Sequence, residues 1–184
     1  YPILTVTAIT HRKNPVYPTT IVGLPPQEDY YLGKATERVF LPLLKTIVPD
    51  IIDYDLPMFG TFHNCAFISI KKQYPMHARK VMHAIWGLGQ AMFSKVIVVV
   101  DEDVDVQNFS EVAWRALNNI DPQRDIEFVT GPVDSLEHAS RLPNYGSKMG
   151  IDATNKWPGE TSREWGRTIT MKPEVTGRMD ALWT

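Results

Sequence analysis

The sequence predicts an α/β fold: an open, doubly wound, mainly parallel sheet with helices on both faces, followed by an extended tail and a short helix. Segments of strand-like and helix-like hydrophobic period alternate over residues 62–129. Residues 95–100 form a β-branched run typical of a strand covered on both faces, which we expect to be the central strand. After Gly131 the periodicity is lost, and this loss indicates the tail.

The other helices and strands are predicted from the same hydrophobic periodicities and from local start and stop signals. Apolar residues recur at three- and four-residue spacing over residues 28–48, which predicts a helix that Pro42 should kink or break. A second helix should begin near Pro75, and Asn108 with Glu111 resembles a capping box that opens a third. The expected strands, besides the central one, cover residues 3–8, 19–22, 51–56, 62–70 and 126–129.

These elements divide the chain into three parts. Residues 1–26 are a lead-in strand and a Pro-rich loop, residues 27–131 are the α/β core, and residues 132–184 are the tail. Within the tail, residues 173–183 should form a short helix. A structureless stretch of about forty residues is unusual inside a compact domain, so we expect the tail to pack on a partner subunit. Its apolar anchors at the interface of a homodimer or larger even-numbered oligomer would be Trp157, Trp165 and Trp183.

Composition narrows the class of partner. The net charge is −2 and no segment clusters Lys and Arg, so nucleic acid is not an expected partner. Cys65 is the only cysteine, which rules out an internal disulfide and fits a reducing compartment such as the cytoplasm. The longest apolar run, residues 96–100, is too short to span a membrane.

No complete catalytic or metal-binding motif is present in the sequence. The acids of residues 101–105 imitate the start of a calcium loop, but Val106 and Val112 stand where that loop needs Gly and Glu. We therefore interpret them as a solvated loop before a helix. Gly87 and Gly89 lack the third glycine of a dinucleotide fingerprint. HExxH and a serine nucleophile elbow are also missing.

Three long blocks resemble a known family. HRKNPVYPTTIVGLPPQED, SIKKQYPMHARKVMHAIWGLGQAMFSKVIVVVDEDVDV and GSKMGIDATNKWPGETSREWGR, in this order, are similar to the UbiD family. Its members decarboxylate 3-polyprenyl-4-hydroxybenzoate and related aromatic or α,β-unsaturated acids. The resemblance implies non-oxidative loss of CO2 with prenylated FMN, a divalent metal (Mn or Mg) and K, in which the flavin is the electron sink.

The resemblance covers the C-terminal domain of such enzymes, which closes over the active-site cleft and drives oligomerisation. The flavin, the metals and the catalytic Glu-Arg-Glu/Asp network belong to an N-terminal domain of the same polypeptide. We therefore expect no catalytic, cofactor-binding or metal-binding residue here, and an inactive isolated fragment. The apolar, β-prone start of the chain without Met also indicates a piece of a larger enzyme. A polyprenyl substrate would be the only link to a membrane.

By similarity, part of the chain should form one wall of the substrate pocket, although a core role for the same residues stays open. These residues lie at the start of the first long helix and in one later loop: Asp29, Tyr30, Leu32, Gly33, Asp134 and Leu136. Two other functions remain as alternatives. One is a stand-alone assembly module without activity. The other is a free nucleotide-binding protein, which the missing phosphate-binding glycines disfavour.

Overall fold

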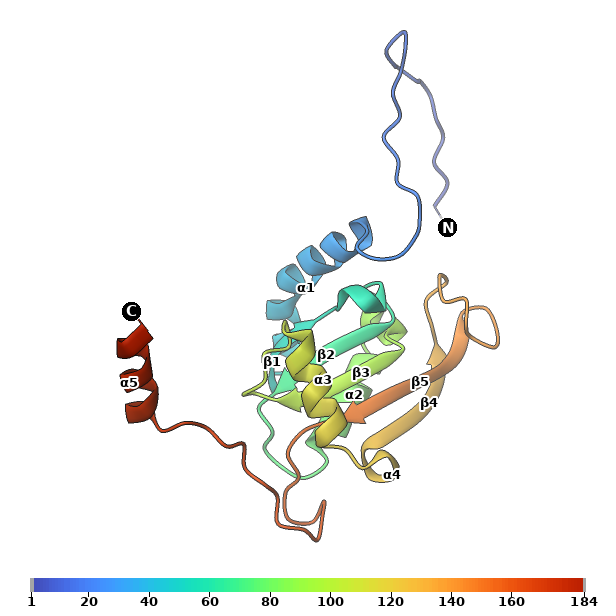
Figure 1. The fold of residues 1–184 in the computed structure, drawn as a ribbon. Helices are drawn as coiled ribbons and strands as arrows, with labels where there is room; N and C mark the ends of the chain where they lie inside the picture. Colours follow the sequence, from blue (N-terminus) through green and yellow to red (C-terminus); the bar gives the residue numbers. More distant parts are fainter. Residues whose placement is uncertain (1, 184) are drawn as a thin grey trace.

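A computed structural model describes residues 2–183 as one mixed sheet with helices packed on it (Figure 1). The strand order is β1-β2-β3-β5-β4. The strands are β1 (Ile51–Asp55), β2 (Cys65–Ile70), β3 (Val96–Asp101), β4 (Ile126–Pro132) and β5 (Tyr145–Asp152). The helices are α1 (Glu28–Ile47), α2 (His77–Trp86), α3 (Phe109–Asn118), α4 (Pro122–Asp125) and α5 (Pro173–Trp183), with 3-10 turns η1 (Met58–Gly60) and η2 (Gly89–Phe93).

The three middle strands are parallel and the two edge strands are antiparallel to them. Ile70 of β2 lies opposite Asp101 of β3, and Val99 of β3 lies opposite Asp152 of β5, so these strands end at the same edge. β1 pairs antiparallel with β2, and β4 with β5. Residues 56–64 join β1 to β2 and residues 133–144 join β4 to β5 without an α-helix, as suits antiparallel neighbours. The predicted α/β class and the central position of β3 are confirmed.

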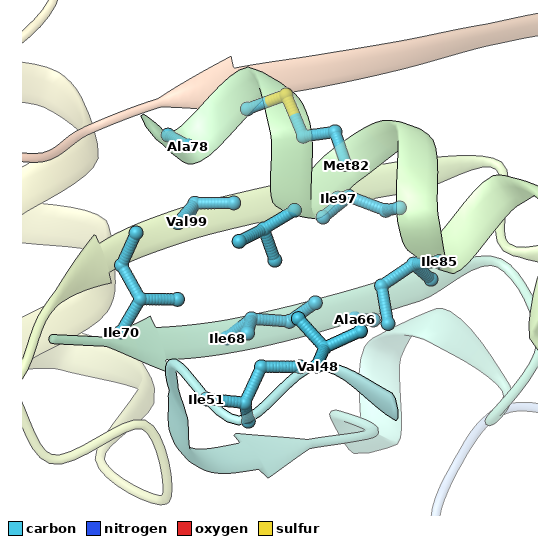
Figure 2. Close-up of a cluster of buried hydrophobic side chains, with 11 residues drawn as sticks. Val48, Ile51, Ala66, Ile68, Ile70, Ala78, Met82, Ile85, Ile97 and Val99 are labelled. Atoms are coloured by element: carbon cyan, nitrogen blue, oxygen red, sulfur yellow. The ribbon is translucent and has the colours of Figure 1, made fainter. Parts of the chain in front are cut away.

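Helices cover both faces of the sheet, as the sequence predicts. On one face, α1 and α2 pack over a buried cluster in which Met82 and Ile85 of α2 meet Ile97 of β3 (Figure 2). On the other face, Val112 of α3 packs with Val98 and Val100. The core therefore lies on both sides of β3, whose residues 97–100 are all at most 5% exposed.

Helix α1 runs without interruption through Pro42, so of the two expected outcomes, a kink or a break, the break does not occur. A proline inside a helix removes one backbone hydrogen bond. Here the inward-facing side chains on both sides of it, Leu41 and Leu44, pack against the same core cluster. Packing of the helix face against the sheet compensates for the missing bond, because most helical stability in proteins comes from such contacts.

The two ends of the chain differ from the sequence prediction in part. The strands expected at residues 3–8 and 19–22 do not form, because no neighbouring strand pairs with them; residues 2–24 are an exposed arm (Figure 1). The expected lack of structure after Gly131 is wrong for residues 145–152, which form β5 between β3 and β4. The sheet therefore extends to Asp152. The predicted terminal helix is confirmed as α5, and residues 166–183 are exposed throughout.

None of the helices described in residues 2–183 combines the length and the apolar character needed to cross a membrane.

Candidate functional site

The six predicted wall residues belong to two segments, the start of α1 and the loop after β4, and both segments lie at the end of the sheet where β2, β3 and β5 begin (Figure 1). The start of α1 is placed there by two contacts: Gly33 packs against the Phe62 side chain, and Lys34 pairs with Asp55, the last residue of β1. Asp134 and Leu136 follow β4, whose last residue pairs with the first residue of β5. Both groups are therefore at the amino edge of the parallel strands.

The residues at the start of α1 face different surroundings. Gly33 is buried, and a Cβ there would come 2.7 Å from the Cβ of Phe62, so glycine permits this close approach. Leu32, in contrast, is 63% exposed. Tyr30 is half-buried, with its ring 5.2 Å from that of Tyr31. Asp29 accepts the backbone N–H of Tyr30. Gly33 is thus buried against Phe62, while the exposed Leu32 side chain can contact a neighbouring group.

The loop after β4 is anchored by a buried acid. Asp134 accepts the backbone N–H of Leu136 at 2.8 Å, and this turn leaves the Leu136 side chain 69% exposed. The next residue, Glu137, is buried and pairs with Lys95 just before β3. Burial alone would raise the pKa of Glu137, but the hydrogen bond from Lys95 and its charge hold it below its ordinary value. The ion pair between Lys95 and Glu137 thus fixes the loop that carries the exposed Leu136 side chain.

A buried charge network beneath α1 was not predicted from the sequence. Glu37 is fully buried, accepts the backbone N–H of Leu56 at 2.7 Å and pairs with Lys34 and Arg38, each at 3.1 Å. Lys34 also donates to Gln107 at 2.6 Å. The sequence did contain one indication of it: Glu37 is an acid on the inward face of a helix, and a buried charge needs partners. The network fixes the start of α1 against β1 and the loop before α3.

The structure does not join the two groups of wall residues into one pocket. Within residues 2–183 no hydrogen bond or ion pair connects the start of α1 with the loop after β4. One cavity lies between the end of α3 and residues 161–166, and another lies between β4, β5 and Arg141. Neither is lined by a predicted wall residue. The start of α1 and the loop after β4 are therefore two separate segments at this edge of the sheet.

The opposite edge of the sheet is covered by the chain itself. Open α/β sheets commonly bind ligands outside the carboxyl ends of their strands. Here residues 153–161 lie over those ends, and the backbone N–H of Asn155 donates to Asp101 at 2.7 Å. In the acidic run, Asp103 pairs with Arg115 and Asp105 accepts the N–H of Gln107. This arrangement occupies the usual nucleotide position and disfavours the nucleotide-binding alternative.

Replacing Asp101 with Asn is expected to stabilise the chain at neutral pH but not in acid. Burial raises the pKa of Asp101 from 3.8 to about 6. The folded state therefore binds this proton more tightly than the unfolded state, and stability falls as pH rises from about 4 to about 6. An amide keeps an acceptor for Asn155 and cannot ionise. We expect a gain of up to about 3 kcal/mol at pH 7.5 and none at pH 4, measured by urea unfolding. An equal difference at both pH values would contradict the assignment.

Comparison with solved structures gives the class of protein. The chain is similar to vanillic acid decarboxylase of Sedimentibacter hydroxybenzoicus in its closed form, with TM-score 0.81 and 26% identity over 95% of this chain and 37% of that chain. It is also similar to the UbiD-class enzyme HmfF from Pelotomaculum thermopropionicum in complex with FMN, with TM-score 0.65 and 28% identity over 83% of this chain and 33% of that chain.

Sequence comparison then gives the family. Residues 30–153 match the 3-octaprenyl-4-hydroxybenzoate carboxy-lyase C-terminal domain, and the chain belongs to this UbiD family. An uncharacterized protein of Aquifex aeolicus is 54% identical over 184 residues, and one of Archaeoglobus fulgidus is 50% identical over 185 residues. Each comparison covers 100% of this chain and 38% of the relative, so the chain spans well under half the length of these relatives.

Proposed function

We propose that this chain covers the active-site cleft and drives oligomerisation in a non-oxidative carboxy-lyase. The substrate would be an aromatic or α,β-unsaturated acid of the 3-polyprenyl-4-hydroxybenzoate type. The match of residues 30–153 to the UbiD C-terminal domain carries the proposal. The exposed Leu32 and Leu136 at one edge of the sheet support it, because apolar side chains on fixed supports suit the wall of a cleft for a largely apolar acid.

The proposed cofactor is prenylated FMN, with Mn or Mg and K, held by a flavin-binding domain outside this chain. HmfF was solved with FMN, and an evolved dimeric form of it with prFMN. Two features of the described residues support placing the cofactor outside this chain. Within residues 2–183 no set of three or more His, Cys, Asp or Glu is arranged to hold a metal. The first turn of α1 carries Glu28 and Asp29, which would oppose a phosphate at that helix end.

A binding measurement tests whether the flavin is held by a domain outside this chain. The chain alone and a polypeptide extended upstream in its reading frame would be titrated with FMN and followed by flavin fluorescence. We expect saturable binding only by the extended protein. Tight binding of FMN by the 184-residue chain would contradict the proposal. A start codon close to Tyr1, with no upstream coding segment, would favour the alternative, which is a stand-alone assembly module.

The proposed assembly is a homodimer or larger even-numbered oligomer. Trp183 is 90% exposed on α5, together with Met179 and Leu182 of the same helix. Trp157 and Trp165 pack partly on their own domain: Lys72 lies over the Trp157 ring, and the Trp165 indole N–H donates to Asn155 at 2.9 Å. Burying one large apolar side chain contributes roughly 1.5–3 kcal/mol. We therefore propose the α5 side chains as the main apolar contacts with a partner subunit.

Removing the C-terminal arm, residues 167–184, is expected to dissociate the oligomer, because the arm carries these contacts. The chain should be cut after Gly166, which leaves all five strands intact. A cut after Gly146 would instead remove most of β5 and disturb the sheet itself. Light scattering should give a larger mass for the intact chain than for the shortened one. A monomeric intact chain, or an oligomer that survives truncation, would count against the assembly.

A further inference from the structure

A cavity of about 350 Å³ lies beside β4, β5 and the loop that joins these two strands (Figure 1). Thr130 of β4 lies directly opposite Ser147 of β5, so both hydroxyl side chains stand on the same face of the sheet, where both residues are exposed. The volume falls in the range of about 300–1,000 Å³ that is usual for small-molecule sites. The other lining residues come from the loop and the start of β5: Arg141, Leu142, Tyr145 and Gly146.

The polar side chains of this cavity have no partner among residues 2–183. Neither the guanidinium group of Arg141 nor the hydroxyl groups of Thr130 and Ser147 form a hydrogen bond or an ion pair there. Elsewhere on the sheet an arginine is paired, as Arg79 is with Glu127 at 2.7 Å. No Asp or Glu of the described residues lines the cavity. The cavity therefore holds one uncompensated positive charge and free hydrogen-bond donors.

The loop that carries Arg141 is fixed on both sides of this residue. The Ser140 hydroxyl donates to the Leu142 carbonyl at 2.8 Å, and the backbone N–H of Tyr145 donates to the same carbonyl at 3.3 Å. A Cβ at Gly146 would come 2.9 Å from the Cβ of Ser140, so the loop packs directly on the backbone of β5. A loop fixed in this way reduces the entropy that is lost when a ligand binds.

The lining favours a small organic acid over a metal ion or a phosphate. A guanidinium group without a neighbouring carboxylate repels cations. Arginine binds a carboxylate through two parallel hydrogen bonds, and its single charge balances one carboxylate but not a phosphate dianion. The body of the acid would contact the Leu142 side chain and the Tyr145 ring, which are 58% and 50% exposed. Apolar walls with a few convergent polar groups are typical of small-molecule sites.

We propose that this cavity binds a small organic monocarboxylate. Arg141 binds the carboxylate, and the hydroxyl groups of Thr130 and Ser147 donate to its oxygens. Leu142 and Tyr145 cover the apolar body of the acid. The inference does not rest on the proposed decarboxylation, because none of the lining residues belongs to the proposed cleft wall. A failure of one therefore leaves the other standing.

Titration calorimetry tests the site with the 184-residue chain and benzoate as the probe. Inorganic phosphate has a different charge and shape, and benzyl alcohol has the ring without the carboxylate. Arg141→Gln removes the cation, whereas Arg141→Lys keeps the charge but loses the planar fork that binds a carboxylate through two bonds. Arg167→Gln is the matched control, because Arg167 is an exposed arginine that lines neither cavity.

We expect saturable binding of benzoate that is weaker by about tenfold or more in Arg141→Gln and by about threefold or more in Arg141→Lys. Arg167→Gln should bind benzoate as the unmodified chain does, and Ser147→Ala should bind it about twofold or more weakly. No saturation by benzoate up to about 10 mM overturns the proposal. So does equal binding by Arg141→Gln, or equal binding of benzyl alcohol. Binding of phosphate that is tighter than that of benzoate and depends on Arg141 overturns the carboxylate assignment.

Discussion

Replacing Lys156 with Met is expected to lower the free energy of unfolding by about 3–5 kcal/mol. The ammonium group lies 3.0 Å from Asp152 and 3.3 Å from Asp125, and all three side chains are at most 4% exposed. Methionine fills a similar volume but leaves the carboxylates without this partner in a site shielded from water. Removing one member of a buried ion pair is strongly destabilising because the remaining charge stays desolvated.

Urea unfolding measures this effect, with Lys80→Met as the matched control. Lys80 also pairs with a carboxylate, but its side chain is 47% exposed, so its loss should change stability by no more than about 1 kcal/mol. Equal losses in the two variants would show that burial does not determine the strength of the Lys156 contacts.

Replacing Ile97 with Ala should cost about 2–5 kcal/mol of unfolding free energy. Ile97 is fully buried in the central strand, within the cluster formed by β2, β3 and α2 (Figure 2). The substitution removes apolar contacts and leaves a cavity that the packed helix fills only partly. Ile3→Ala is the control, since Ile3 is 92% exposed. Thermal unfolding followed by circular dichroism should separate the two variants clearly, and matching midpoints would contradict the assignment of the core.

Local sequence signals predicted much of the fold. The apolar spacing of residues 28–48 gave α1 almost to its ends, and the β-branched run gave β3. The cap predicted at Asn108 is confirmed, because its side chain accepts the backbone N–H of Glu111. These elements depend on patterns within a few residues, which a single sequence displays directly.

Strand β5 was missed because its buried positions do not carry apolar side chains. Its burial alternates, and the buried positions hold Gly146, Lys148, Gly150 and Asp152. At Gly150, an added Cβ would lie 2.5 Å from the sulfur of Met82, so α2 packs directly against the strand backbone. Lys148 reaches the carbonyl of Met92 with its ammonium group. The usual alternation of apolar and polar residues is therefore lost.

The candidate site was predictable only in part. The family resemblance selected residues at the start of α1 and after β4, and the structure places both groups at the same edge of the sheet. The resemblance could not show that Gly33 is buried while Leu32 is exposed. The contact between Lys72 and Glu160 joins residues 88 positions apart. No local pattern encodes such a pair, because it depends on how the strands are brought together.

Release of CO2 tests the central claim most directly. The 184-residue chain and a polypeptide extended upstream in its reading frame would each receive prenylated FMN, Mn and K. Both would then be assayed with a 4-hydroxybenzoate and an α,β-unsaturated acid. We expect CO2 release only by the extended protein, with a loss of activity when Leu32→Asp places a charge on the proposed cleft wall. Equal CO2 release by the shorter chain alone, or an extended protein that binds the flavin but decarboxylates neither acid, would contradict it.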